Sequence, residues 1–174
     1  PVRENFRANP FWRAFYADPI GTAFETEISF LLQHYHDIKD AGRLERLAAC
    51  DFSLYLDLSY AHVTLPPAKR KAFMAVYRQI EHEVGAPSLL VHLKCAPKIE
   101  LERIRRRGRK VEKPISFEYL EEINTSIARV LAKANLAKEI LEIDSGLLDF
   151  AHNSGVQSNV LTQFRQKFAA LNVV

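Results

Sequence analysis

The sequence is poor in the residues that mark several common classes of protein. Its 174 residues include two cysteines, Cys50 and Cys95, one Met and one Trp. So few cysteines exclude a disulfide-rich secreted framework, and their apolar surroundings predict buried, reduced thiols in a cytoplasmic protein. No apolar run reaches membrane-spanning length, and no signal peptide opens the chain. We therefore expect a globular protein with no membrane partner.

The sequence also lacks a large excess of either positive or negative charge. Lys and Arg number 24 and Asp and Glu 21, which gives a net charge of +3. The positive charge is concentrated in one segment, which favours a local anion site over the broad basic face that nucleic-acid binding requires. Hydrophobic content of 48% and charged content of 26% are typical of one ordinary domain covering residues 1–174.

The concentrated charge is a run of five arginines within seven residues, from Arg103 to Arg109. It follows the apolar segment 88–94 and Pro97, an order that predicts a strand, a turn and a helix. Arg103 and Arg107 are four residues apart and share one helix face. Guanidinium groups converging there suit phosphate oxygens. The alternative is a solvated basic helix end that complements its own dipole.

Hydrophobic periodicity predicts the remaining elements. A short aromatic helix should begin at Asn9 and Pro10 and end at Asp18. Longer helices are expected over 22–39, 68–84, 116–137 and 156–171, and strands over 88–94, 139–144 and a short piece ending at Asp51. Helices alternating with short apolar strands indicate an α/β fold, rich in helix, with a parallel sheet.

Three polar positions stand out within these elements. Asp51 follows a predicted strand, where open α/β sheets bind ligands, but it can equally cap the next helix. Glu27 lies beside the apolar stripe of helix 22–39, which consists of Phe24, Ile28, Leu31, Leu32, Tyr35 and Ile38, and its alternative is a boundary residue turned to water. His34 and His36 point to opposite sides of that helix and cannot share a metal.

Seven runs together resemble the deoxynucleoside kinase family, in particular its bacterial deoxyguanosine/deoxyadenosine kinase branch. They are PVRENF, NPFWRAFY, AFETEISFLLQHY, CDFSLYLDLSYAHVTL, LLVHLKCAP, ERIRRRGRKVEKPISFEYLEEI and EILEID. The resemblance implies a parallel sheet like that of P-loop kinases, flanked by helices and carrying an Arg-rich lid. It also implies a homodimer, for which helix 22–39 is a candidate surface.

The resemblance also implies roles for individual residues. The lid arginines that hold the donor phosphates match Arg103, Arg107 and Arg109, and Arg103 also stabilises the transferring phosphoryl group. The acid and the tyrosine that hold the sugar 3′-hydroxyl match Glu112 and Tyr16. Asp51 matches the catalytic acid near Mg²⁺, and Glu27 matches the base reader. Phe52 replaces the arginine that follows this acid in the family and is assigned to substrate binding.

The activity implied is phosphorylation of a purine deoxynucleoside at its 5′-hydroxyl, with ATP or another nucleoside triphosphate as donor and Mg²⁺ as cofactor. The family often has Gln as base reader, and Glu27 changes the chemistry. Guanine presents two adjacent donors that one carboxylate accepts together, whereas adenine presents a donor beside an acceptor. We therefore expect deoxyguanosine to be favoured, with deoxyadenosine next. Asp149 and Phe150 are further candidates for contact with the donor base.

One departure from the family is the phosphate-binding loop. None of the six glycines is followed by Lys, so the GxxGxGK[ST] pattern is missing. The family's general-base Glu would stand directly before Pro1, so we expect an N-terminal strand, phosphate loop and helix of roughly 35–40 residues to be absent from this sequence. The rival interpretations are a nucleoside monophosphate kinase such as a thymidylate kinase, and a non-catalytic nucleotide-binding relative.

Overall fold

A computed structural model of the chain describes residues 1–43, 47–133 and 136–171. The chain divides into two compact units, each formed by two segments. Unit 1 consists of Pro1–Gly85 and Gly108–Ala132, and unit 2 consists of Ala86–Arg107 and Lys133–Val174.

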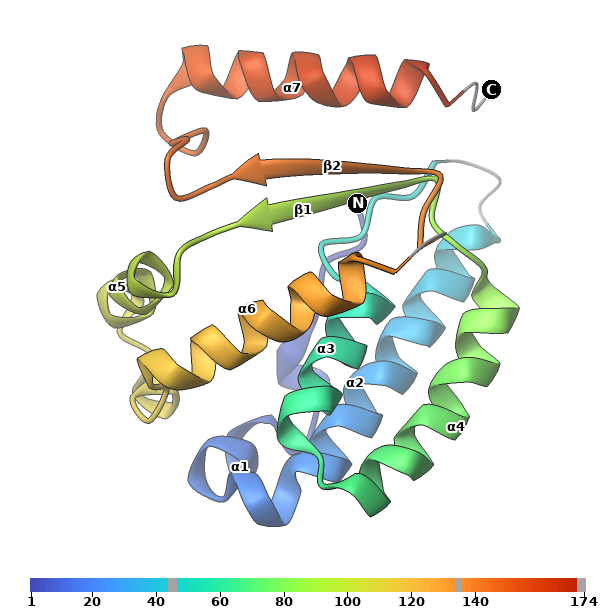
Figure 1. The fold of residues 1–174 in the computed structure, drawn as a ribbon, viewed down its shortest axis with the longest axis vertical. Helices are drawn as coiled ribbons and strands as arrows, with labels where there is room; N and C mark the ends of the chain where they lie inside the picture. The colour runs from blue at the N-terminus through green and yellow to red at the C-terminus, as the bar shows by residue number, and fades with distance from the viewer. Residues whose placement is uncertain (44–46, 134–135, 172–174) are drawn as a thin grey trace. The chain divides into compact units, whose positions relative to one another are not determined.

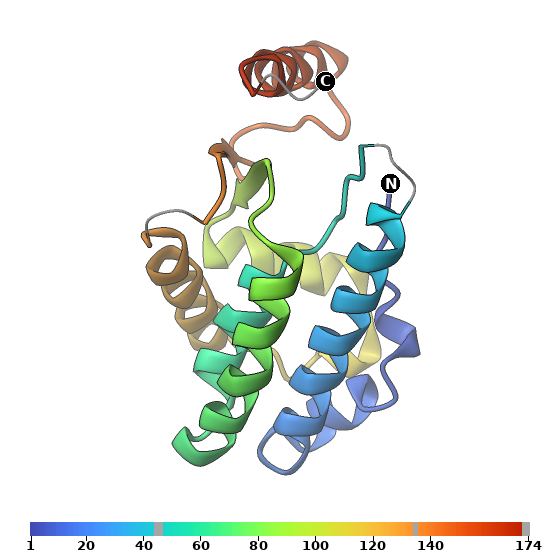
Figure 2. The ribbon, with the colours of Figure 1, turned by 90° about the vertical axis from the view of Figure 1, so that its right-hand side faces the viewer.

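Unit 1 is helical. Its elements are η1 (Phe6–Ala8), α1 (Trp12–Ala17), α2 (Pro19–Gly42), α3 (Leu54–Thr64), α4 (Pro67–Val84), η2 (Lys110–Glu112) and α6 (Phe117–Leu131). The central helix is α3, which packs against α2, α4 and α6, while α2 and α4 lie side by side (Figure 2). The strand predicted to end at Asp51 is reduced to a parallel bridge between Val2 and Cys50.

Local side chains explain where these helices begin. Asp18 caps α2 by accepting from the backbone N–H of Gly21 at 2.9 Å, so α2 starts earlier than predicted. Ser116 caps α6 as expected. The predicted cap at Asp51 was wrong, because Ser53 caps α3 instead. The predicted start of α1 at Asn9 was also wrong, because the helix begins at Trp12. The buried side chain of Asn9 instead accepts from the backbone N–H of Phe11 and donates to the carbonyl of Thr26 on α2.

Unit 2 contains the sheet. Strands β1 (Leu89–Lys94) and β2 (Glu139–Asp144) are parallel, with Leu89 opposite Glu139 and Lys94 opposite Asp144. Helix α5 (Pro97–Arg107) leaves the carboxyl end of β1, and α7 (Ser154–Ala169) packs along β2 (Figure 1). The predicted parallel sheet, the helix opened by Pro97 and the strand 139–144 are confirmed.

The buried face of α2 is not the predicted apolar stripe. Its buried residues are Ala23, Thr26, Glu27, Leu31, His34 and Ala41. Of the predicted stripe only Leu31 is buried, while Leu32 is 49% exposed. Three polar side chains on the interior face of one helix are unusual for a purely structural core, and buried polar groups of this kind are typical of functional sites.

The cysteines are free, as predicted, but the prediction that they are buried was wrong. Cys50 and Cys95 are both half-buried. Partial burial, followed by the nearby charge of Asp51, raises the pKa of the Cys50 thiol, so Cys50 is not an activated nucleophile. Within the described ranges, none of the helices is both long and apolar enough to cross a bilayer.

Candidate active site

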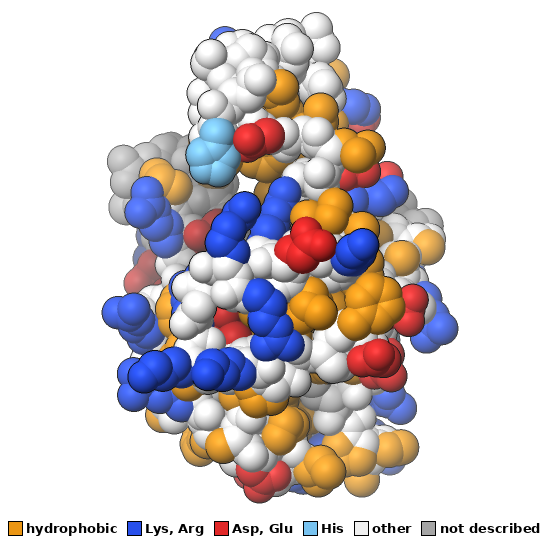
Figure 3. All heavy atoms as spheres, turned by 90° about the vertical axis from the view of Figure 1, so that its left-hand side faces the viewer, with side chains coloured by type: hydrophobic (Ala, Val, Ile, Leu, Met, Phe, Trp, Pro, Cys, Tyr) orange, Lys and Arg blue, Asp and Glu red, His pale blue; other side chains and the backbone are white. Residues whose placement is uncertain are grey.

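An open pocket of about 610 Å³ lies in unit 2, where α5 and the loop after β2 follow the carboxyl ends of the two strands. Its lining residues are Ile99, Glu102, Arg103, Arg106, Ser145, Leu148, Asp149, Phe150, Ala151 and His152. Figure 3 shows Lys and Arg side chains gathered on the face of the molecule that carries α5. Parallel α/β sheets bind ligands at this end, and two arginines make this pocket suited to an anion.

Arg103 is held firmly at this pocket. One guanidinium nitrogen donates to the backbone carbonyl of Ser145 at 2.6 Å, and another lies 3.5 Å from the Ser145 hydroxyl and 3.7 Å from Cys95 Sγ. Ser145 is in turn tied to the end of β1, because its hydroxyl and its backbone N–H both donate to the carbonyl of Lys94. The sheet therefore fixes the guanidinium before any ligand binds, which is what electrostatic stabilisation requires.

The loop on the other side of the pocket carries the predicted pair Asp149 and Phe150. The Asp149 carboxylate accepts from the backbone N–H of His152 and contacts its ring Nδ1 at 2.9 Å. This contact lowers the pKa of Asp149. Both predicted residues line the pocket. Arg107, which also belongs to the predicted lid, is exposed on α5 and is not among the lining residues.

The sugar-binding candidates lie in unit 1. Glu112 is 3% exposed at the end of η2 and accepts from Arg109 at 3.1 Å. The guanidinium of Arg109 also lies 4.6 Å from the centre of the Phe6 ring. Tyr16 is on α1, which is in contact with η2, and its ring packs edge-on against Phe15. The structure thus brings the elements that carry Tyr16 and Glu112 together, and it makes Arg109 a partner of Glu112.

Two carboxyl groups on α2 are candidates for base recognition. Glu27 is only 4% exposed and accepts from the Thr64 hydroxyl at 3.0 Å, so the alternative of a residue turned to water was wrong. Burial raises the pKa of Glu27 to about 8 despite the bond from Thr64. Glu25 was missed by sequence reasoning. Its Oε2 is buried and has no hydrogen-bond partner within the described part of the chain.

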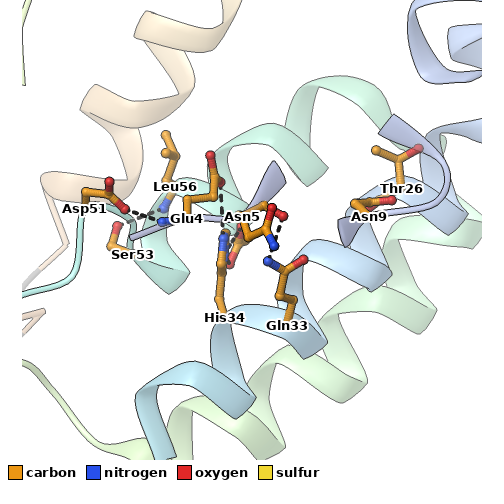
Figure 4. A network of polar contacts seen from close by, with 10 residues as sticks. Glu4, Asn5, Asn9, Thr26, Gln33, His34, Asp51, Ser53 and Leu56 are labelled. Atoms are coloured by element: carbon orange, nitrogen blue, oxygen red, sulfur yellow. Dashed lines mark hydrogen bonds and ion pairs between the residues drawn. The ribbon is translucent and has the colours of Figure 1, made fainter. Parts of the chain in front are cut away.

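Asp51 is exposed at the end of the segment that pairs with the N-terminus. Its Oδ1 accepts from the backbone N–H of Glu4 at 2.6 Å, as Figure 4 shows. The ring of the next residue, Phe52, is buried and stacks on His34 with a centroid distance of 4.1 Å. Phe52 is therefore a core residue that contacts His34, and no local sequence pattern predicts this contact.

Asp51 fits Mg²⁺ as a single ligand. Among the described residues no group of three or more His, Cys, Asp or Glu side chains could hold a metal ion by itself. Magnesium in phosphoryl-transfer sites needs only one or two carboxylates, since substrate phosphates and water complete its shell. The exposed carboxylate of Asp51 matches this requirement.

A parallel sheet with an arginine-lined pocket at its carboxyl end suits the class of phosphotransferases, because fixed guanidinium groups there can bind phosphate oxygens. The profile of the deoxynucleoside kinase family matches residues 1–169. The chain therefore belongs to the deoxynucleoside kinase family.

Individual relatives agree with this assignment. The deoxyguanosine kinase of Bacillus subtilis is 24% identical over 159 residues, which are 87% of this chain and 77% of the relative. The deoxyadenosine kinase of Dictyostelium discoideum is 26% identical over 120 residues, 66% of this chain and 49% of the relative. The structure of the deoxyadenosine kinase of M. mycoides with bound dCTP has the same fold, with a TM-score of 0.78 at 18% identity, covering 94% of this chain and 84% of that one.

Proposed function

We propose that the protein transfers the terminal phosphoryl group of ATP, or another nucleoside triphosphate, to the 5′-hydroxyl of a purine deoxynucleoside. The observation that carries this proposal is the guanidinium of Arg103, which Ser145 anchors at the pocket of unit 2. Negative charge on a transferring phosphoryl group must be met by fixed cations, and an anchored guanidinium needs no reorganisation during the reaction.

Further side chains take the roles that their positions support. Arg106 adds a second cation in the pocket, and the Phe150 ring, also in its lining, suits the apolar face of the donor base. Arg107 and Arg109 are assigned to the donor phosphates as further lid arginines. When bound, Mg²⁺ neutralises charge on the donor phosphates, and Asp51 is the side chain that we assign to it.

The acceptor is held in unit 1. Glu112 accepts a hydrogen bond from the sugar 3′-hydroxyl, and Tyr16 assists from α1. The burial of Glu112 supports this role, because a carboxylate out of water forms a strong hydrogen bond with a substrate hydroxyl. The contact with Arg109 holds the Glu112 side chain in one orientation.

We assign base recognition to the acids of α2, with deoxyguanosine favoured and deoxyadenosine next. Relatives of both names match at similar identity, so the preference rests on side-chain chemistry. The two adjacent donors of guanine stabilise the ionised form of Glu27 when the base binds, and the carboxylate then accepts from both, whereas a protonated Glu27 complements the donor and acceptor of adenine. Glu25 is the second candidate, because its buried Oε2 has no hydrogen-bond partner among the residues that the structure describes.

Kinetics with alternative acceptors test the proposal. The purified protein should turn over deoxyguanosine with ATP and Mg²⁺, deoxyadenosine less well, and dGMP not at all. Turnover of dGMP alone would support a nucleoside monophosphate kinase, and turnover of none would support a non-catalytic relative. Glu25→Gln and Glu27→Gln, two residues apart on one helix, serve as each other's control, and the variant with altered base preference identifies the reader.

We also propose a cytoplasmic homodimer. The free thiols of Cys50 and Cys95 suit a reducing compartment. Leu32 on α2 and Val76 on α4 are 49% and 38% exposed on neighbouring helices, which supports this side of unit 1 as the association surface. Sedimentation of the protein and of a Leu32→Lys variant tests the proposal, since the variant should be monomeric.

A further inference from the structure

His34 is the most enclosed polar group on α2, with an exposed fraction of 1%. Its Nδ1 lies 2.9 and 3.0 Å from the two carboxylate oxygens of Asp57 on α3, and its Nε2 lies 3.2 Å from Oε1 of Glu4. A neutral imidazole has one donor nitrogen and one acceptor nitrogen, and carboxylates only accept. Both contacts can be hydrogen bonds only if the ring is an imidazolium that donates from both nitrogens.

Aromatic packing fixes the plane of this ring. Phe52 stacks on it with an interplanar angle of 11°, and Phe30 lies 5.8 Å from it at 29°. The groups that face His34 are thus the carboxylate of Asp57 from α3, the carboxylate of Glu4 from the N-terminal segment, and these two rings. Burial alone would lower the pKa of His34, but its hydrogen bonds to Asp57 and Glu4 outweigh burial and raise the pKa to about 9.

Glu4 connects this buried cation to the candidate active site. Its side chain binds His34, while its backbone N–H donates to Asp51 at 2.6 Å (Figure 4). The neighbouring backbone is tied to the same segment, because Val2 and Cys50 form a parallel bridge. The side chain of Gln33, next to His34 on α2, donates to the carbonyl of Asn5 at 3.0 Å. Movement of Glu4 would therefore move the partner of the Asp51 carboxylate.

We propose that His34 is a positioning residue, held as an imidazolium between Asp57 and Glu4, that fixes the N-terminal segment and through it the carboxylate of Asp51. A buried ion pair adds little net stability compared with well-packed apolar side chains, so its main effect here is a defined geometry. The inference rests on the proposed function, in which Asp51 serves phosphoryl transfer.

Imidazole ¹⁵N chemical shifts give a test that does not depend on activity. In labelled protein at pH 7.5, both ring nitrogens of His34 should be protonated, and they should remain so until the pH approaches 9. Asp57→Asn should convert His34 to a neutral ring at the same pH. The exposed residues His36 and His152 provide reference signals in the same spectra. A neutral His34 ring in the unmodified protein at pH 7.5 would overturn the proposal.

Kinetics then test the positioning role. His34→Gln should lower kcat about tenfold or more, because small displacements of reacting groups are costly, and should leave the KM for ATP within about twofold. His34→Arg, which keeps the charge and two donors, should recover part of the loss. His36→Gln, at an exposed site on the same helix, is the matched control. Rates are normalised to the folded fraction measured by circular dichroism.

The kinetic and ¹⁵N experiments together distinguish failure of this inference from failure of the proposed function. A folded His34→Gln variant with unchanged kcat and an unchanged pH–rate profile would mean that His34 has a structural role only. If the unmodified protein phosphorylates no deoxynucleoside, the proposed function fails, while the ¹⁵N shifts still decide whether His34 is an imidazolium.

Discussion

The functional charged side chains of this kinase are exposed to solvent in unit 2 and buried in unit 1. In unit 2, Arg103 and Arg106 lie on an exposed helix at the edge of an open pocket. In unit 1, Glu27, His34 and Asp57 lie inside the helical core with exposed fractions of 5% or less. Exposed cations are ready to meet a mobile polyanion. Buried acids instead have perturbed pKa values, which is what recognition of an uncharged acceptor by hydrogen bonds requires.

The largest effect on activity is expected from substitution of Arg103 in unit 2. Arg103→Ala should lower kcat by about 10²–10³-fold, the usual cost of removing one preorganised group that stabilises transition-state charge. The KM for the deoxynucleoside should change little. Steady-state kinetics with both substrates varied measure the two parameters. Arg165→Ala, at an exposed position on α7 in the same unit, should behave like the unmodified protein. Equal losses in kcat and in nucleoside affinity would argue against a role in the transition state.

Next in size is the acid of η2. Glu112→Gln should raise the KM for the deoxynucleoside about tenfold or more, because hydrogen bonds to charged groups contribute about 1.5–3 kcal/mol. Isothermal titration with deoxyguanosine, together with kinetics, measures this change. Glu121→Gln, at an exposed position on α6, is the matched control. A variant that binds the nucleoside normally but loses kcat would move Glu112 out of the sugar site.

Unit 1 should also lose stability as the pH rises. Folding raises the pKa of Glu27 from 4.5 to about 8 and that of His34 from 6.5 to about 9. Between pH 6.5 and 8 the folded state therefore holds protons that the unfolded state has released. The free energy of unfolding should fall across this window, on the order of 1 kcal/mol per pH unit. Urea unfolding at several pH values measures it, and Glu27→Gln should flatten the profile. If the stability of that variant fell equally steeply with pH, the protons retained by the folded state would belong to groups other than Glu27.

The contrast between the units also explains what could be read from the sequence. The run from Arg103 to Arg109 was visible because exposed charge is dense in one segment, and Pro97 marked the start of a helix by local geometry. Two of these arginines nevertheless have separate environments: Arg103 binds Ser145, and Arg109 binds Glu112. Spacing along a helix predicts a shared face, but it does not show where the helix ends and the chain enters another unit.

The interior of unit 1 was harder to predict. The apolar stripe of α2 suggested one buried face, whereas the observed face centres on Glu27, Leu31 and His34. The pair of His34 and Asp57 joins residues 23 positions apart, and Glu4 joins from 30 positions away. Such contacts depend on how helices pack, and no local pattern encodes them. The signal available was the spacing of Glu27, Leu31 and His34, which occupy positions i, i+4 and i+7 on one face of the helix.

A smaller effect is expected on selectivity. As the pH rises through about 8, Glu27 ionises, and an ionised carboxylate suits the two donors of guanine better than the donor and acceptor of adenine. The ratio of kcat/KM for deoxyguanosine to that for deoxyadenosine should therefore rise a few-fold between pH 6.5 and 8.5. Competition assays with both nucleosides measure the ratio directly. Glu27→Gln should make it independent of pH, and Glu25→Gln should not. The reverse outcome would identify Glu25 as the base reader.

The smallest effect is expected for an ion pair that resembles the buried one in geometry but not in environment. Lys39 on α2 lies 2.6 Å from Glu83 on α4, closer than His34 lies to Asp57, yet both side chains are over 40% exposed. Water and salt screen exposed pairs, and ordering two long side chains costs entropy. Lys39→Ala should thus leave the melting temperature and kcat unchanged, whereas Asp57→Asn should lower both. A clear loss of stability in Lys39→Ala, suppressed by high salt, would show that the contact between α2 and α4 depends on this pair, and that burial alone does not distinguish the charged groups of unit 1.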